Sequence, residues 1–492
     1  MTSTTGTRAA SLDDLQRVFA ERDWGESPFM VEQGTILVLP SLSFPPGELR
    51  KIIGIQHYEE RMLFLLLLLR NPDLRLVYLS SLPIDEAILE YYLSFLPDPA
   101  GARERLSCLA VGDPEPRALT AKLLAQPSLV EQARSLADAS PDGYVLPFNV
   151  TWLEQEFAER VGLPLYGPRP ELVALGSKTG SRRAARIAGV PMIDGWEDLR
   201  SLDEVERAVR RLRGRTPPPP EAVVVKLNEG FSGQGNAIVN LRHWGGRLVD
   251  CDTTFGADEE SWPSFEGKIA ESGAVVEELM RTPGTVSPSV QLRVTPDGAV
   301  HLVSTHSQVL GGPGGQVYLG CRFPADDGYR LEIQRWALRV AEVLAAQGVI
   351  GLFGIDFIVV PVPSGVETYV SEINLRIGGT THPFWMALLA TEGTYDPATG
   401  QLVAAGQPKA YLATDNLKSE KLAGLDPAQV VARVAETGLA YDHRARTGVT
   451  LHLLGALREY GKVGVTCIAD SPSGADDLYR ELKRVLTADG QG

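Results

Sequence analysis

Two acidic residues in a hairpin-like stretch constrain this chain more than any other feature. Residues 351–384 read GLFGIDFIVVPVPSGVETYVSEINLRIGGTTHPF, in which two apolar runs flank the turn-rich sequence PVPSG. Apolar runs of this length around such a turn predict a β-hairpin. Asp356 lies inside the first run and Glu372 ends the second, where an ordinary hairpin needs no acid. The hairpin is therefore a candidate functional element as well as a structural one.

Three polar residues alternate at the end of the second run. Because strand side chains alternate between faces, Glu372, Asn374 and Arg376 would point the same way if the chain stays extended. That side would carry a carboxylate, an amide oxygen and a guanidinium. Asp356 on the partner strand would complete an oxygen-rich site for Mg²⁺, which proteins hold with one or two carboxylates while substrate phosphates fill other positions. A solvated hairpin face is the alternative, and these residues alone leave both interpretations open.

Length and charge limit the classes of partner. A chain of 492 residues predicts about three domains. Its net charge of −15 argues against nucleic acid or an anionic membrane as partner, because both need a basic face. The first ten residues lack the apolar segment of a secretory signal. The apolar run at 62–69 is far shorter than the ~20 residues of a membrane helix, so it predicts a buried element.

The cysteines indicate a reducing compartment. Cys108, Cys251, Cys321 and Cys467 are widely scattered and form no CxxC pair. Neither a disulfide framework nor a zinc site is indicated by this spacing. A cytoplasmic location fits this pattern best.

Residues 36–167 predict an α/β domain. The strand-like segments ILVLP, RLVYLSS, LSCLAVG, GYVLPFNV and LPLYG alternate with helical segments. Such alternation predicts a parallel sheet covered by helices on both faces. No GxGxxG follows the first strand, so a dinucleotide site in this domain is not supported.

Two lysines upstream of the hairpin lie in segments that could meet a phosphate. Lys178 lies in the basic helical stretch 169–193, for which a solvated helix face is the alternative. In EAVVVKLNEGFSGQGNAIV, residues 221–239, Lys226 ends a strand before a loop rich in Gly and Ser. Backbone N–H groups of such a loop can surround an anion, although the Walker pattern GxxxxGK[ST] is absent. A nucleotide flap and an ordinary hairpin both stay open for this segment alone.

The segments around the hairpin add further candidates. AVVEELM, residues 274–280, predicts an apolar strand ending in Glu277 and Glu278. The next two strand-like segments contain Arg293 and His306, and an isolated histidine in a strand is more often structural than catalytic. The tail predicts two strands and a terminal helix, a small α+β module whose residues do not indicate a function.

Taken together, these motifs resemble the ATP-grasp superfamily of carboxylate–amine ligases. Lys178, Lys226 with its Gly-rich flap, VVEELM, GIDFIVV and EINLRIGG occur in the order of that superfamily over about residues 170–390. The flanking regions resemble the peptide ligase type known from pheganomycin biosynthesis. The resemblance implies an α/β and α+β architecture with these parts: a parallel-sheet α/β domain in residues 1–170, a two-lobed ATP-grasp domain in 171–405 with its flap lobe at about 192–273, and a C-terminal α+β module in 406–492.

The resemblance also implies a role for each matching position. Arg376 would face the transferred phosphate or the acyl substrate, and Arg293 would be a second catalytic residue. Asp356, Glu372 and Asn374 would hold Mg²⁺, with Mn²⁺ as an alternative. The cofactor ATP would be bound by Lys178, Lys226, Gly230, Ser232, Gly233, Gly235, Glu277, Glu278, Leu279 and Met280.

One position departs from the superfamily pattern. Many relatives place a further Glu after the hinge acid to hold the ribose, whereas Gly284 and Ser287 occupy that region here. The ribose contact is therefore unassigned.

The activity implied is ATP-dependent, ADP-forming amide synthesis. A carboxylate would attack the γ-phosphate to give an acyl phosphate, with Mg²⁺ and cationic side chains stabilising the charge. An amine would then displace phosphate while the closed flap excludes water. His306 and Asp442 are no more than guesses for the base that takes the amine's proton.

The expected substrates are a small carboxylate and the amine of an amino acid or peptide. The first hypothesis is a peptide bond to the N-terminus of a peptide in natural-product (antibiotic) biosynthesis. A dipeptide-forming L-amino acid ligase and a non-catalytic ATP-binding scaffold are the alternatives. No nucleic acid or membrane partner is expected, and the oligomeric state, a homodimer included, stays open.

Overall fold

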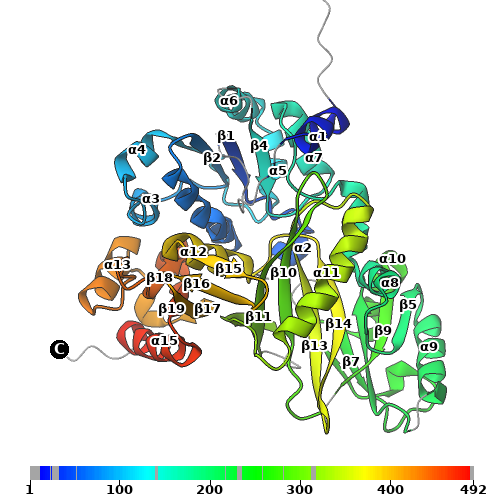
Figure 1. Cartoon of the computed structure of the whole chain (residues 1–492). Helices are drawn as coiled ribbons and strands as arrows, with labels where there is room; N and C mark the ends of the chain where they lie inside the picture. The colour runs from blue at the N-terminus through cyan, green and yellow to red at the C-terminus, as the bar shows by residue number, and fades with distance from the viewer. Residues whose placement is uncertain are drawn as a thin grey trace, which may run out of the picture.

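Three β-sheets of four, five and ten strands organise the chain (Figure 1). The computed structural model describes residues 11–22, 24, 33–50, 52–138, 142–215, 218–229, 235–257, 259–280, 282–311 and 317–487. Gly230, Ser232 and Gly233 of the expected flap lie outside these residues.

The N-terminal sheet is parallel, with strand order β3-β2-β1-β4. Alternate residues of β1 belong to two separate cores: Ile36 and Val38 pack on one face, Leu37 and Leu39 on the other. Both faces are therefore covered, as the sequence predicts. The elements are α1 (Leu12–Ala20), β1 (Gly34–Leu39), α2 (Pro46–Leu49), η1 (Ile55–Arg70), β2 (Leu74–Ser80), α3 (Glu86–Leu93), α4 (Pro99–Glu104), β3 (Leu106–Ala110), α5 (Leu119–Leu124), α6 (Pro127–Ala137), β4 (Tyr144–Pro147) and α7 (Trp152–Val161).

The apolar run at 62–69 is a buried element, as expected. It forms the second half of η1, a long 3₁₀-helix in which nearly every residue of the run is buried. Among the described residues, no helix combines the length and the apolar character needed to cross a membrane.

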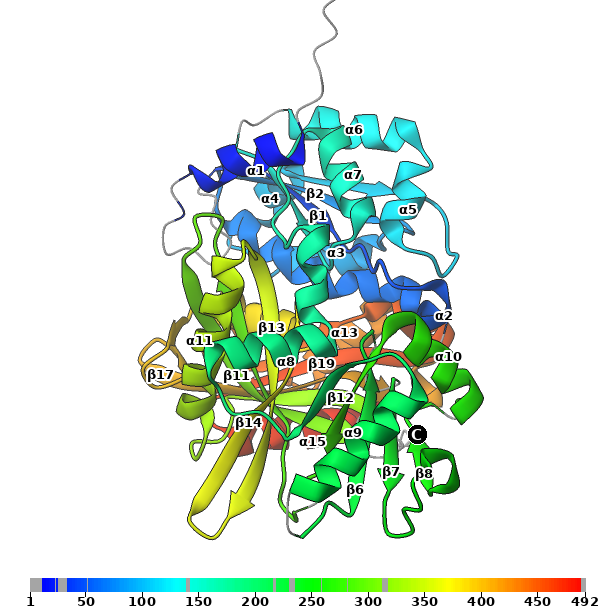
Figure 2. The ribbon, with the colours of Figure 1, turned by 90° about the vertical axis from the view of Figure 1, so that its right-hand side faces the viewer.

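The five-stranded sheet is antiparallel and forms a lobe of its own, with strand order β5-β9-β6-β7-β8 (Figure 2). Its apolar face packs on α9 and α10 around Val225, Val276 and Phe265. The elements are β5 (Gly195–Leu199), α9 (Leu202–Arg215), β6 (Ala222–Leu227), β7 (Asn236–Asn240), η3 (Leu248–Asp250), β8 (Thr253–Phe255), α10 (Trp262–Ser272) and β9 (Ala274–Glu278).

The ten-stranded sheet is antiparallel and carries the hairpin β13–β14 at one edge, in the order β14-β13-β10-β11-β12-β17-β16-β15. The tail joins the same sheet, because β19 pairs with β17 and β18 with β19. The elements are β10 (Pro288–Val294), β11 (Val300–Gly311), β12 (Val317–Phe323), α11 (Arg330–Ala346), β13 (Gly351–Val362), β14 (Gly365–Asn374), α12 (Thr381–Thr391), β15 (Thr394–Asp396), β16 (Gln401–Ala404), β17 (Gln407–Lys418), η5 (Glu420–Leu422), α13 (Pro427–Glu436), β18 (Gly448–His452), η6 (Leu454–Ala456), α14 (Leu457–Tyr460), β19 (Lys462–Ala469) and α15 (Pro472–Thr487).

The basic stretch 169–193 is two helices, where the sequence suggested one. A 3₁₀-helix, η2 (Pro170–Gly176), precedes the α-helix α8 (Lys178–Ala188). Ser177 separates them in an extended conformation and caps α8, its Oγ accepting from the Gly180 N–H at 3.0 Å. The cap places Lys178 at the first position of α8.

The start of the hairpin is tied to the connector that follows the N-terminal sheet. Gly351 has φ +101°, and a Cβ there would lie 2.9 Å from Gly167 Cα and 3.3 Å from Tyr166 O. A side chain at this position would be strained by its backbone angle and would collide with the connector. We expect Gly351→Ala to lower the free energy of unfolding by about 1–3 kcal/mol, measured by chemical denaturation.

Gly47→Ala is the matched control, because a Cβ at Gly47 would meet no atom within 4 Å. It should be neutral or slightly stabilising. Equal stability of the Gly351→Ala variant and the wild type would contradict the close packing described here.

Candidate active site

A cleft of about 990 Å³ is lined by residues of the five-stranded and the ten-stranded sheets. Lys226 on β6 and Glu277 on β9 contribute from the first sheet. Asp356 on β13 and Glu372 on β14 contribute from the second, and Arg376 follows β14. Residues predicted from separate motifs thus meet in one space.

The two hairpin acids face each other directly. Asp356 and Glu372 are register partners across β13 and β14, and a bulge follows Asp356. The Asn374 Nδ2 donates to Asp356 Oδ2 at 3.0 Å and to Glu372 Oε1 at 3.1 Å. Gln308 Nε2 donates to Asp356 Oδ1 at 2.9 Å. Carboxylate and amide groups therefore converge on one point, as the hairpin pattern predicts.

Neighbouring charges shift the pKa values of the two acids in opposite directions. Burial and the adjacent charge of Glu372 raise the pKa of Asp356. Burial also raises the pKa of Glu372, but Lys178, which forms an ion pair with it, together with Lys226 and Arg376, lowers that pKa further than burial raises it. Two opposed carboxylates are ligands that suit Mg²⁺, and the Asn374 side chain adds an amide oxygen beside them. The residues present therefore fit this metal.

A second buried network fixes Lys226. Glu277 is 2% exposed, and its Oε2 lies 2.7 Å from Lys226 Nζ. Its Oε1 accepts from Arg182 at 2.6 Å. Burial raises the pKa of Glu277, but Lys226 and Arg182 outweigh burial and hold that pKa below its ordinary value. Arg182 is thus a buried ion-pair partner of Glu277, which lines the cleft, and is not part of a solvated helix face.

The segment after Glu277 presents backbone groups to the cleft, which Glu278, Leu279 and Met280 line. The Glu278 N–H donates to Asp194 O at 3.0 Å and the Leu279 N–H to Ala222 O at 3.1 Å. Within the described residues, no such bond is found for the Met280 N–H. Among the described residues, the Met280 N–H thus has no backbone acceptor, unlike the N–H groups of Glu278 and Leu279.

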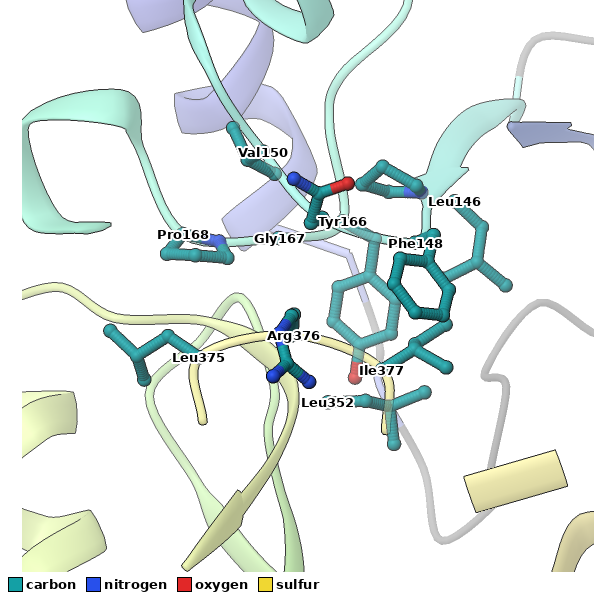
Figure 3. A pocket seen from close by; sticks show the side chains of 12 residues that line it. Leu146, Phe148, Val150, Tyr166, Gly167, Pro168, Leu352, Leu375, Arg376 and Ile377 are labelled. Carbon is teal, nitrogen blue, oxygen red and sulfur yellow. The ribbon is translucent and has the colours of Figure 1, made fainter. Parts of the chain in front are cut away.

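Arg376 lies where the N-terminal region meets the hairpin (Figure 3). Its guanidinium donates to Asn374 Oδ1 at 2.9 Å and lies 5.9 Å from the centre of the Phe44 ring. The neighbouring Ile377 N–H donates to Phe148 O at 3.0 Å, which anchors this turn. Burial lowers the pKa of Arg376. The cation is thus held beside the acid pair.

Arg293 lies outside the described lining of the cleft. Its side chain is 3% exposed and is not among the described residues that line the cleft. Burial lowers its pKa, and the groups that act on it electrostatically are Tyr166, Tyr144 and Asp297. Arg293 shares a strand face with Ser289 and Gln291, which line the cleft, but it lies further along β10, and alternation alone does not show where the cleft ends.

The two guesses for a base are also excluded by position. His306 is fully buried, its Nε2 lies 2.6 Å from the Tyr411 hydroxyl, and burial lowers its pKa to about 3. Asp442 is exposed and lies outside the set of described cleft residues. His306 is therefore structural. Of the expected flap glycines, the described Gly235 accepts through its carbonyl from Leu227 N at 2.8 Å, which closes the β6–β7 hairpin.

Several cleft residues carry no signal in the sequence. Gln308, Tyr58, Arg61 and Lys462 line the cleft but belong to no recognisable motif. Their positions depend on contacts between distant parts of the chain, so pattern and spacing could not identify them.

Comparisons with known proteins agree with this geometry. A family model described as PGM1 C-terminal domain matches residues 429–482, and one described as IQCH-like, ATP-grasp matches residues 254–397. The L-propargylglycine–L-glutamate ligase of Streptantibioticus cattleyicolor is 34% identical over 467 residues, covering 92% of this chain and 94% of that protein. IQ motif-containing protein H of Danio rerio is 21% identical over 502 residues, covering 90% of this chain and 47% of that protein.

Solved structures show the same fold. Biotin carboxylase from Campylobacter jejuni has a TM-score of 0.55 at 14% identity, covering 91% of this chain and 90% of that one. An ADP complex of N5-carboxyaminoimidazole ribonucleotide synthetase has a TM-score of 0.54 at 13% identity, covering 92% and 96% of the two chains.

Fold and site together define an ATP-grasp enzyme, a carbon–nitrogen ligase that forms amide bonds. The chain belongs to the pheganomycin-type ATP-grasp ligases, the group that includes the ligase of S. cattleyicolor. The resemblance, the fold class and the ligase activity expected from the sequence are confirmed.

The network around Glu277 gives a test that does not depend on catalysis. Glu277→Gln should lower the free energy of unfolding by about 3–5 kcal/mol at pH 7, because it leaves Lys226 buried without its anion and removes one of the two carboxylates that pair with Arg182. The pKa of Glu277 is lowered on folding, so its contribution is complete above the ordinary pKa of 4.5 and is lost as the pH falls below that value. The difference between variant and wild type should therefore shrink in acid.

Denaturant titrations between pH 2.5 and pH 7 measure this difference, since its loss is expected below pH 4.5. Glu278→Gln is the control, since Glu278 is half-buried and its pKa is raised, by burial and then by Asp194. A pH-independent difference for Glu277→Gln would refute the ion network.

Proposed function

We propose that the cleft binds ATP with Mg²⁺ and couples its hydrolysis to amide formation between two amino acid substrates. The observation that carries this proposal is the directly opposed pair Asp356 and Glu372, with Lys178 and Lys226 on the side of the five-stranded lobe. An acid pair of this kind in a cleft is costly to retain unless a cation neutralises it.

Asp356, Glu372 and Asn374 would hold the metal. Mg²⁺ bound there would neutralise negative charge that develops during phosphoryl transfer. The Lys178–Glu372 ion pair keeps Glu372 ionised and so keeps a ligand available.

The nucleotide would lie between the lobes. The Met280 N–H offers a hydrogen-bond donor for the edge of the adenine, while Glu278 and Leu279 border it. Lys178 and Lys226, both at least nine-tenths buried, would meet the phosphates. The flap residues Gly230, Ser232 and Gly233 stay predicted contacts, as does Gly235.

Arg376 would act at the reacting end. Its cation lies beside Asn374. There an oxygen of the substrate carboxylate would attack the γ-phosphate, so that an acyl phosphate forms and ADP leaves. A fixed positive charge there stabilises the transferring phosphoryl group without reorganisation. The neutral amine then attacks the acyl carbon, and phosphate departs with the bonding electrons while the amine releases a proton.

The substrate class is proposed from the relative. The name of the S. cattleyicolor enzyme pairs two amino acids, L-propargylglycine and L-glutamate. This pairing supports an amino acid ligase over an enzyme that extends a peptide, so the order of the two hypotheses from the sequence is reversed. All four cysteines carry free thiols, which is consistent with the proposed cytoplasmic location.

The proposal is tested by incubating the purified chain with ATP, Mg²⁺, L-glutamate and each of a panel of free amino acids. ADP, phosphate and one amide should form in equal amounts, the amide identified by mass spectrometry. ATP binding without phosphate release from any mixture of acids and amines would show a nucleotide-binding scaffold instead. Turnover only with peptide amines would restore the peptide-extending ligase.

The metal assignment gives a variant test. Glu372→Gln keeps the side-chain volume but removes one metal-binding charge, so ATP-dependent phosphate release should fall on the order of 1000-fold. Circular dichroism should show an unchanged fold. Glu367→Gln is the control on the same strand, because Glu367 is exposed and outside the described cleft lining. Wild-type turnover in Glu372→Gln would refute the assignment.

A further inference from the structure

The cleft continues past Arg376 into a region built from three distant segments. Tyr58 comes from η1 of the N-terminal region, Lys418 from the end of β17, and Lys462 from the start of β19. All three line the same cleft as the acid pair. This end therefore adjoins the place where the substrates react.

Arg61 in this region is already committed to a structural pair. Its guanidinium forms an ion pair with Asp415 Oδ2. The other oxygen, Oδ1, lies 3.1 Å from His382 Nε2 and 2.7 Å from His452 Nε2. Burial raises the pKa of Asp415, but Arg61 and His382 outweigh it and keep that pKa well below the ordinary value. Asp415 thus remains ionised and neutralises Arg61.

Lys462 has no comparable partner. Its side chain is 8% exposed, and its Nζ donates to the Tyr58 hydroxyl at 2.8 Å and lies 4.8 Å from the centre of that ring. Among the described residues, no carboxylate lies within ion-pair distance of this ammonium. A buried cation is costly without an anion, and a phenol supplies only a neutral acceptor.

The neighbouring strand adds a second positive charge. Lys418 is the register partner of Lys462, so the two side chains lie on one face of the sheet. Like charges directly opposite each other destabilise a sheet, unless a bound anion lies between them. The Arg61 Cζ lies 4.1 Å from the centre of the Tyr58 ring, but Asp415 neutralises the charge of Arg61, so the unpaired charge here belongs to the two lysines.

We propose that Lys462, Tyr58 and Lys418 form a subsite for a substrate carboxylate that does not react. The inference rests on the proposed function. The subsite would hold one of the two substrates at a second point, away from the reaction beside Arg376 and the acid pair. It names the substrate class. At least one substrate is an amino acid with a carboxylate that takes no part in the reaction, and this carboxylate is neither amidated nor joined to a longer peptide.

Equilibrium binding tests the subsite without turnover. Isothermal titration would compare L-glutamate with its two monoamides, L-glutamine and L-isoglutamine, on enzyme saturated with Mg²⁺ and ADP. Wild type should bind glutamate about 10- to 100-fold more tightly than the amide that lacks the contacted carboxylate. This ratio is the usual effect on affinity of one hydrogen bond to a charged group. Lys462→Met should remove this preference.

Lys409→Met is the matched control. Lys409 is a buried lysine of β17 that pairs with Asp470 at 2.5 Å and lies outside the described cleft lining. It should lose stability and keep the preference, whereas Lys462→Met should be at least as stable as wild type because it removes an unpaired charge.

The outcomes separate the two proposals. Lack of glutamate binding by wild type, or a preference that survives Lys462→Met, would overturn the subsite. Loss of the preference in Lys462→Met supports it, even if no mixture yields ADP and amide, a result that would reject the proposed function alone.

Discussion

Two carboxylates placed opposite each other on adjacent strands are the constraint on which the rest of this structure depends. Asp356 and Glu372 share a register position, so their charges repel across one rung of the ladder. A bulge beside Asp356, the Asn374 amide and the Lys178 ammonium hold the pair in place. Two facing carboxylates add little to the stability of the hairpin, but they form a suitable pair of ligands for a divalent cation.

The cations around the pair are positioned by networks of their own. Lys226 is held by Glu277, and Glu277 is held by Arg182 from α8. Through these contacts the first turns of α8, the five-stranded lobe and the hairpin form one electrostatic unit. The positive charges that an ATP phosphate would meet are therefore held in place before the nucleotide binds. Preorganised charges of this kind lower the barrier for phosphoryl transfer.

The sequence predicted the parts of the site that depend on local pattern. The hairpin, the strand 274–278 and the strand that ends at Lys226 follow from periodicity and turn residues, and the order of their motifs indicated the family. Arg182 looked like part of a solvated face, because its partner Glu277 lies 95 positions away. Arg293 lies outside the described lining of the cleft although it shares a face of β10 with Ser289 and Gln291, because the sequence does not show how far the cleft extends along the strand.

The tail shows the same limit more clearly. Its strands were recognisable, but their hydrogen bonds to β17, and through it to the sheet of the hairpin, were not. Lys462 meets Tyr58 across 404 positions of sequence. The spacing of such residues in the sequence does not indicate that they meet. They come together only because the N-terminal region packs against the folded ten-stranded sheet.

The most direct test of the account is a crystal structure with Mn²⁺ and a non-hydrolysable ATP analogue, read by the anomalous signal of the metal. We expect a peak between Asp356 and Glu372, next to the nucleotide phosphates. A bound nucleotide with no peak there, or with the metal instead at the buried His382, Asp415 and His452, would contradict it.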